Sequence, residues 1–255
     1  MILEETMNQL SHMRLHAMAK ALDERLSRSD HKDLSHQAFV GLIVQDEWID
    51  KENKKLNRRL KNAKFKIQAC LAEIDYTQKR QGLQKSKIMD LSTLKWIQCH
   101  QNILLVGPTG IGKSFIAQAF GHRACEQGHT SHYVRLTKLL NDLFLAKADG
   151  SYNNFLYKLS KYDVLIIDDW GIAKLKNEEA QYLLDIIEDR YEIKSTIITT
   201  QLPIKHWHEF IMDDTVADAI CDRLVHNSIK IEMKGPSMRE VMSQKKQSKK
   251  EKNLD

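Results

Sequence analysis

Apolar residues in the first 70 positions recur with the spacing of helix faces. The first set follows intervals of three and four residues, the period of one face of an α-helix. It comprises Leu15, Met18, Leu22 and Leu26. A polar stretch over residues 27–35 predicts a loop. A second apolar set follows and comprises Phe39, Leu42, Ile43, Trp48, Ile49, Leu56 and Leu60. The pattern predicts a small, all-helical N-terminal domain over residues 1–70.

From residue 102 onward, short apolar runs alternate with longer amphipathic stretches. The runs predict strands over residues 103–106, 132–135, 164–167 and 196–199. The amphipathic stretches predict helices over residues 113–127, 136–146 and 178–191. Such alternation favours an α/β fold, in which a parallel sheet carries helices on both faces. Between the two patterns, residues 74–101 predict a linker followed by a short amphipathic helix.

Composition is consistent with a globular protein of two parts. The chain has 255 residues, of which 42% are hydrophobic and 29% are charged. It contains no run of 18 apolar residues and no visible secretory signal, so we expect no contact with a membrane. We place the domain boundary near residue 70 and expect the second domain to cover residues 71–242. Residues 243–255 are lysine-rich and predict a disordered tail.

Cysteine and histidine positions bear on metal binding and on the cellular compartment. The four cysteines are widely scattered and form no C-x-x-C pair, so a zinc site and a disulfide framework are both disfavoured. This pattern fits a reducing cytoplasm. His206 and His208 flank Trp207, but no acidic or thiol partner has ligand spacing, so we expect surface histidines rather than a metal site.

Positive charge is concentrated in two segments, although the net charge is only +5. Residues 51–66 hold eight basic side chains and one acid, Glu52. Such a cluster binds phosphate backbones with strong salt dependence. We therefore predict nucleic-acid contact through this segment, with Arg58, Arg59, Lys61 and Lys64 as the DNA-binding candidates. For the lysines of the tail, a solvated segment is the preferred interpretation.

A glycine-rich motif follows the first predicted strand. Residues 107–114 match G-x-x-x-x-G-K-S, the phosphate-binding loop. Glycines let the backbone wrap phosphates closely, and the next helix presents its N-terminus to the anion. Lys113 supplies positive charge for the β- and γ-phosphates, and the Ser114 hydroxyl ligates Mg²⁺. The predicted ATP-binding residues are Gly107, Pro108, Thr109, Gly110, Ile111, Gly112, Lys113, Ser114 and Phe115.

Acidic and polar residues end two later strands. An apolar run over residues 164–167 ends in Asp168 and Asp169, the pattern of a Walker B strand. We predict that Asp168 helps to hold Mg²⁺ and that Asp169 polarises the attacking water. Thr200 and Gln201 end the next strand, and either a γ-phosphate contact or simple strand termination would explain them.

Two arginines follow the core pattern. Arg223 and Arg239 could stabilise charge on a transferring phosphoryl group, which is a common role of arginine. A surface ion pair explains each of them equally well, because spacing alone does not show that either reaches ATP.

Taken in order, these motifs resemble the IstB-like family. These proteins are AAA+ ATPases encoded by insertion sequences and are related to the DnaC helicase loaders. The segments LSHMRLHAMAKALDE and LKNAKFK are similar to the family's N-terminal part. The segments GPTGIGKS, VLIIDDWG, IITTQLP, VADAICDRLVH and GPSMRE then follow in the family's order. The resemblance covers nearly the whole chain, and the last two segments are its most specific part.

The resemblance implies residue roles that spacing does not provide. Arg223 would be the arginine finger that completes a neighbouring subunit's ATP site. Arg239 would be the sensor 2 arginine, which acts on ATP of its own subunit. Thr200 and Gln201 fall at the sensor 1 position. The implied fold is an AAA+ P-loop core preceded by the small helical domain.

The resemblance also implies partners and a function. The protein would be a bacterial, cytoplasmic transposition helper that oligomerises with ATP. It would bind duplex DNA largely independently of sequence and deliver it to a transposase. A DnaC-like loader of a replicative helicase is the alternative, and preference for single-stranded DNA would favour it. A nucleotide-binding adaptor with little hydrolysis is a third possibility, which steady-state ATPase activity would distinguish.

Overall fold

A computed structural model describes residues 2–28, 34–77, 80–238 and 240. The chain forms two compact units, Met1–Arg58 and Arg59–Asp255. Residues 29–33 of the predicted loop and the predicted tail, 243–255, lie outside the described residues. None of the helices in the described ranges combines the length and the apolar character that a membrane span requires.

The first unit is helical, as predicted. It contains α1 (Ile2–His12), α2 (His16–Ser27) and most of α3 (His36–Ala63). Ala19, Ala21 and Ile43 are buried there. The Glu47 carboxylate accepts a hydrogen bond of 2.9 Å from the backbone N–H of Met18, which joins α3 to α2. Trp48 and Ile49, expected on the apolar face, are instead 63% and 41% exposed.

The boundary between the units lies earlier than the predicted position near residue 70. It falls within α3, because the end of this helix and the following residues contact α6 (Lys113–Glu126) in the second unit. Arg59 Nε donates 2.9 Å to the carbonyl oxygen of Cys125. The Phe65 ring stacks on His122 with 4.2 Å between ring centroids. Through these contacts, residues 59–70 pack as part of the second unit.

The second unit is built on a five-stranded, all-parallel sheet with strand order β2-β3-β4-β1-β5. Its strands are β1 (Asn102–Val106), β2 (Ser131–Arg135), β3 (Val164–Trp170), β4 (Ser195–Thr200) and β5 (Ser228–Glu232). The first four were predicted. The fifth lies at the sheet edge, where Lys230 and Glu232 are exposed, so its apolar signal is weak. The predicted α/β class with a parallel sheet is confirmed.

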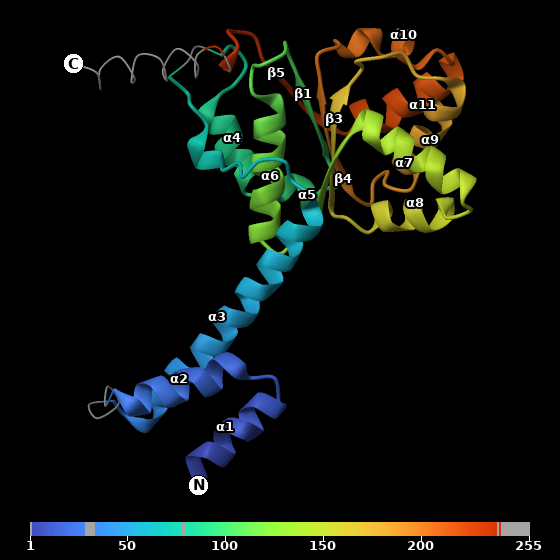
Figure 1. Ribbon diagram of the computed structural model, residues 1–255. Helices are drawn as coiled ribbons and strands as arrows, with labels where there is room; N and C mark the ends of the chain where they lie inside the picture. The colour runs from blue at the N-terminus through green and yellow to red at the C-terminus, as the bar shows by residue number, and fades with distance from the viewer. Residues whose placement is uncertain (1, 29–33, 78–79, 239, 241–255) are drawn as a thin grey trace, which may run out of the picture. The chain divides into compact units, whose positions relative to one another are not determined.

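Helices cover both faces of this sheet (Figure 1). One face carries α6 with α4 (Lys85–Ser92), α5 (Lys95–Gln98) and the short helix η1 (Leu71–Glu73). The other carries α7 (Leu136–Ala148), α8 (Tyr152–Ser160), α9 (Asn177–Glu188), α10 (Trp207–Ile211) and α11 (Asp214–Val225). A short helix, η2 (Ile204–His206), leads into α10.

Alternate residues of β1, β2, β3 and β4 enter the two hydrophobic clusters. Leu165 and Ile167 of β3 pack against α7–α11, whereas Val164 and Ile166 pack on the α6 face. Burial of both faces explains why the central strands are continuous apolar runs. The short amphipathic helix predicted at the end of residues 74–101 is instead two short helices, α4 and α5, because Leu94 between them adopts φ 64°.

Strand order determines what can meet at the carboxyl edge of the sheet. β4 lies between β1 and β3, and β2 lies on the outer side of β3. Val106 pairs with Thr200, and Arg135 pairs with Asp168. The phosphate-binding loop and the ends of β2, β3 and β4 therefore lie together.

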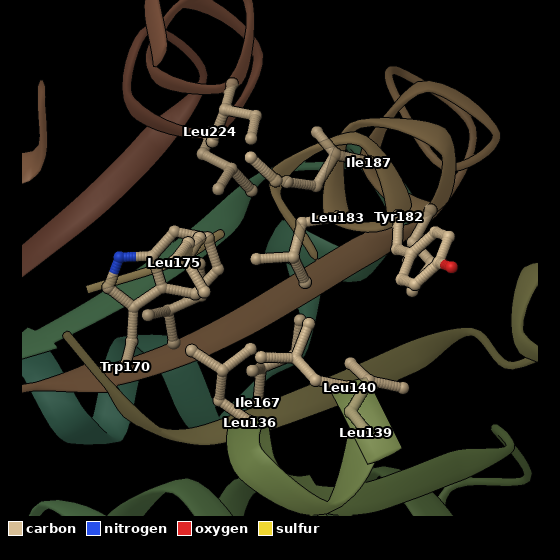
Figure 2. Packing of buried hydrophobic residues seen from close by; sticks show 14 of the residues in the cluster. Leu136, Leu139, Leu140, Ile167, Trp170, Leu175, Tyr182, Leu183, Ile187 and Leu224 are labelled. Carbon is tan, nitrogen blue, oxygen red and sulfur yellow. The ribbon is translucent and has the colours of Figure 1, made fainter. Parts of the chain in front are cut away.

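Leu183 on α9 tests the packing of the α7–α11 face, because it is fully buried among the side chains that Figure 2 shows. We expect Leu183→Ala to lower the free energy of unfolding by about 2–5 kcal/mol, since the truncated side chain leaves a cavity. Leu145 on α7 is 61% exposed, and Leu145→Ala should change the same quantity by less than about 0.5 kcal/mol. Urea denaturation followed by circular dichroism measures both. Equal effects would contradict the placement of Leu183.

Candidate nucleotide-binding site

The phosphate-binding loop joins β1 to α6. Gly110 and Gly112 adopt φ values of 80° and 102°, in the left-handed region that favours glycine. A Cβ atom at Gly110 would collide with the Ser237 side chain, and one at Gly112 would lie 3.0 Å from Arg80 Nη1. The loop ends at Lys113, where α6 begins, so backbone N–H groups at a helix N-terminus face its interior.

Lys113 is the cation of this loop. Its residue is only 8% exposed, and Nζ donates to the carbonyl oxygens of Gly107 at 2.7 Å and Pro108 at 2.8 Å. The ammonium group thus lies across the loop, close to the positions that phosphate oxygens would take. This geometry fits the predicted contact with the β- and γ-phosphates.

Asp168 is the centre of the acidic part of the site. It ends the apolar part of β3 and is 2% exposed. Oδ1 accepts hydrogen bonds from Ser114 Oγ at 2.8 Å and from the Thr199 hydroxyl, and Oδ2 accepts one from the Tyr133 hydroxyl at 2.6 Å. Three neutral donors from three elements therefore hold one buried carboxylate. The structure brings the two predicted metal ligands, Ser114 and Asp168, together.

Tyr133 and Thr199 were not among the predicted site residues. Burial, followed by the hydrogen bond to Asp168, raises the pKa of the Tyr133 phenol, so the phenol stays protonated and remains a donor at neutral pH. In the sequence, the only indication that Tyr133 and Thr199 belong to the site was their position within predicted strands. Both side chains lie near the carboxyl end of a strand that pairs with β3.

Asp169 lies at an irregularity of β3. Its φ is 65°, and the β3–β4 register shifts between Ile167 and Trp170. Its N–H donates to Thr199 Oγ1 at 3.2 Å. Its partly exposed carboxylate is 3.6 Å from Arg135 Nε. Arg135 is a further residue that the sequence analysis did not identify. The Asp169 side chain is 37% exposed, whereas Asp168 is buried.

The end of β4 separates the two predicted sensor 1 residues. Thr200 is 1% exposed, and its hydroxyl donates to the carbonyl oxygen of Trp170 at 2.8 Å. Gln201 is exposed, and its Oε1 accepts a hydrogen bond of 2.6 Å from Thr109 Oγ1 in the phosphate-binding loop. Gln201 and Thr199 thus contact the site, whereas the Thr200 hydroxyl terminates the strand.

The remaining predicted loop residues have different surroundings. Pro108 and Thr109 are exposed, whereas Ile111 is fully buried in the cluster on the α6 face. Phe115 is partly buried against the same cluster. Ile111 and Phe115 therefore use their side chains for packing, and only their backbone groups can face the loop interior.

The structure describes one of the two predicted arginines, Arg223. Arg223 on α11 pairs with Glu188 on α9 at 2.8 Å and also donates to the carbonyl oxygen of Ala219 at 3.0 Å. Its guanidinium carbon lies 5.8 Å from the centroid of the Tyr191 ring. Arg239 lies outside the described residues.

The DNA-binding candidates differ in their surroundings. Arg58, Lys61 and Lys64 are exposed, whereas Arg59 is half-buried and donates to Cys125 as described above. Arg59 thus has a structural contact in addition to any role in binding.

The histidines near residue 207 pair with acids rather than with each other. His206 Nδ1 is 3.0 Å from Glu209, and His208 Nε2 is 2.8 Å from Asp218. Within the described part of the chain, no group of three or more metal-ligating side chains is present.

The donor set fits magnesium nucleotide. Hydroxyl and carboxylate oxygens are the ligands that Mg²⁺ prefers, and Ser114 and Asp168 present one of each, 2.8 Å apart. Backbone amides and Lys113 face the place where phosphates would lie. Together, the strand order and this site define a P-loop ATP-binding domain of the AAA+ class.

The chain belongs to the IstB-like ATP binding protein family, whose model matches residues 8–248. It is 42% identical to an insertion sequence ATP-binding protein of Sinorhizobium fredii over 94% of this chain and 97% of that protein. It is 41% identical to the ATP-binding protein of insertion sequence IS1162 from Pseudomonas fluorescens, over 80% of this chain and 88% of the relative. The family and its ATP-binding character, predicted from the motifs, are confirmed.

Two solved structures share the fold. The DnaI structure superposes with a TM-score of 0.57 at 19% identity, covering 66% of this chain and 92% of DnaI. A DnaC helicase loader superposes with a TM-score of 0.50 at 22% identity, covering 58% of this chain and 87% of that chain. At this identity the likeness concerns the fold.

Replacing Lys113 tests the phosphate-binding loop. We expect Lys113→Met to weaken binding of a fluorescent ATP analogue at least about tenfold, because a charge-assisted hydrogen bond contributes about 1.5–3 kcal/mol. Lys138 on α7 is an exposed lysine outside the site, and Lys138→Met is the control that should leave the affinity unchanged. Equal affinities of Lys113→Met and wild type would show that the loop does not hold the nucleotide.

Proposed function

We propose that this protein is an ATP-dependent transposition helper. It hydrolyses ATP with magnesium, assembles on duplex DNA in the bacterial cytoplasm and delivers that DNA to a transposase. The contact between Ser114 and Asp168 beside the phosphate-binding loop is the observation that carries the proposed ATPase activity. The transposition role is supported by the family and by relatives whose names place them in insertion sequences.

The chemistry follows from the positions of the acids. Magnesium held near Ser114 and Asp168 would neutralise charge on the β- and γ-phosphates. Lys113 would bind oxygens of the same two phosphates. Asp169 follows Asp168 directly, and its partly exposed carboxylate can accept a hydrogen bond from an attacking water. Gln201 contacts Thr109 in the phosphate-binding loop, which supports a role for Gln201 in sensing the γ-phosphate.

A second subunit completes the site in this proposal. Among its described contacts, Arg223 pairs with Glu188 on α9, donates to Ala219 on α11 and lies over the Tyr191 ring. None of these groups belongs to the phosphate-binding loop or to the ends of β2, β3 and β4. From the family, we infer that Arg223 acts on the ATP of a neighbouring subunit and that ATP binding favours an oligomer. Arg239 acts as the sensor 2 residue within its own subunit. A contact between different patches of adjacent copies builds a ring or a helix, either of which can surround a duplex.

A mixing experiment tests the action of Arg223 on a neighbouring subunit. Lys113→Met lacks the loop cation, and Arg223→Ala lacks the finger, so we expect each variant alone to hydrolyse ATP poorly. Mixing equal amounts should restore about a quarter of the wild-type rate, because random pairing joins one intact loop to one intact arginine in that share of interfaces. A steady-state phosphate-release assay measures all three samples.

Each protein must first be shown to have wild-type circular dichroism. A mixture no faster than the mean of the two separate variants would contradict the neighbour role of Arg223. Normal hydrolysis by Arg223→Ala alone would also contradict it.

DNA contact is proposed through the exposed basic side chains of α3 and the residue that follows it. Arg58, Lys61 and Lys64 are free of the packing contact that Arg59 makes with α6. Contacts of lysine and arginine with phosphates carry no sequence information, so binding is largely independent of sequence. Assembly on DNA then presents the duplex to the transposase.

Replacing Arg58, Lys61 and Lys64 with alanine tests this contact without disturbing Arg59. We expect weaker binding of duplex DNA and a slope of log affinity against log salt smaller by up to about three, one for each phosphate that is no longer neutralised. Fluorescence anisotropy between about 50 and 200 mM salt measures the slope. The control replaces the exposed lysines Lys20, Lys95 and Lys205, which removes equal charge from three other elements.

An unchanged slope in the first variant, or an equal decrease in the control, would rule out a specific contact through α3. The same assay with single-stranded DNA separates transposition from helicase loading. Preference for the single strand would favour a helicase loader and contradict the proposed delivery of duplex DNA.

A further inference from the structure

Tyr133 is a buried residue at the site that the proposed chemistry leaves without a role. It lies on β2, in register with Ile166 of β3, and is 4% exposed. Its hydroxyl donates 2.6 Å to Oδ2 of Asp168. It approaches Asp168 from the β2 side, whereas Ser114 approaches from the phosphate-binding loop.

The two oxygens of Asp168 have different partners. Oδ1 accepts from Ser114 and Thr199, so this oxygen lies beside the metal-ligand candidate of the loop. Oδ2 accepts from Tyr133. Ser114 Oγ has lone pairs for a metal while its O–H group still donates to Oδ1 of Asp168. Asp168 can therefore present Oδ1 to a metal while the hydrogen bond from Tyr133 to Oδ2 stays intact.

The orientation of such a carboxylate needs an anchor. The last torsion of an aspartate side chain is broad and roughly two-fold, so rotation of the group is limited mainly by its hydrogen bonds. The donors at Oδ1 include Ser114, which is itself assigned to the metal in the proposed function. The donor at Oδ2 comes from a packed strand and is independent of the nucleotide.

We propose that Tyr133 is a positioning residue for magnesium: its hydroxyl fixes the Asp168 carboxylate so that Oδ1 faces Ser114. This inference rests on the proposed function, in which Asp168 helps to hold the metal of MgATP. Partners that orient metal-binding groups in this way typically contribute about 10- to 100-fold to metal affinity. Tyr133 contacts neither nucleotide nor metal in this arrangement and acts through Asp168.

The test removes one hydroxyl group. Tyr133→Phe keeps the buried ring, and binding of a fluorescent ATP analogue is titrated against Mg²⁺ and repeated in EDTA. We expect the half-saturating Mg²⁺ concentration to rise about tenfold, with an affinity in EDTA close to that of wild type. If the Tyr133 hydroxyl had only a packing role, Tyr133→Phe would change the nucleotide affinity with Mg²⁺ and the affinity in EDTA by the same factor, or would change neither.

Tyr152→Phe is the matched control. The Tyr152 hydroxyl donates 2.7 Å to Oδ2 of Asp185, which is the same kind of bond outside the site. This variant should lose a comparable amount of stability and keep the wild-type dependence on Mg²⁺. A rise of equal size in both variants would overturn the proposal.

A second comparison separates the effect through Asp168 from any loss of stability in Tyr133→Phe. In an Asp168→Asn background, adding Tyr133→Phe should produce no further change in Mg²⁺ dependence, because the effect acts through that carboxylate. An undiminished further change would overturn the proposal, as would unchanged Mg²⁺ dependence in the single variant. If wild-type protein itself binds nucleotide equally with and without Mg²⁺, it is the proposed MgATP function that fails.

Discussion

One buried carboxylate organises the functional edge of this protein. The Asp168 side chain is accommodated at 2% exposure because Ser114, Thr199 and Tyr133 all donate to it. Those donors belong to the phosphate-binding loop, β4 and β2, so they can converge only if β4 lies between β1 and β3 and β2 lies beyond β3. The strand order and the chemistry of the site are thus two aspects of one constraint.

Much of this arrangement could be predicted from the chain. The apolar runs of β1 to β4 are buried on both faces, so they stand out in the sequence, and the glycines and Lys113 form a motif whose spacing is physically required. The family was also predicted from the motifs. The half-exposed edge strand β5 gave a weak signal, because Ile231 is its one fully buried position.

Side-chain partners were harder to predict, since they depend on register across strands that are distant in sequence. Nothing local distinguishes Thr199 from Thr200, yet one contacts Asp168 and the other closes the strand end. Tyr133 likewise becomes part of the site only because β2 pairs with β3. The roles of Asp169, Gln201 and Arg223 stay predictions, and Arg239 lies outside the described residues.

The ion pair between Arg223 and Glu188 has a consequence for assembly. In the proposed assembly, an arginine that already pairs within its own chain would exchange one anionic partner for another when it engages a neighbour. Such an exchange would yield only the difference between two similar interactions, so the contact between copies would be weak per site and readily reversible. Reversibility of this kind would suit an assembly that forms and comes apart with each cycle of nucleotide turnover.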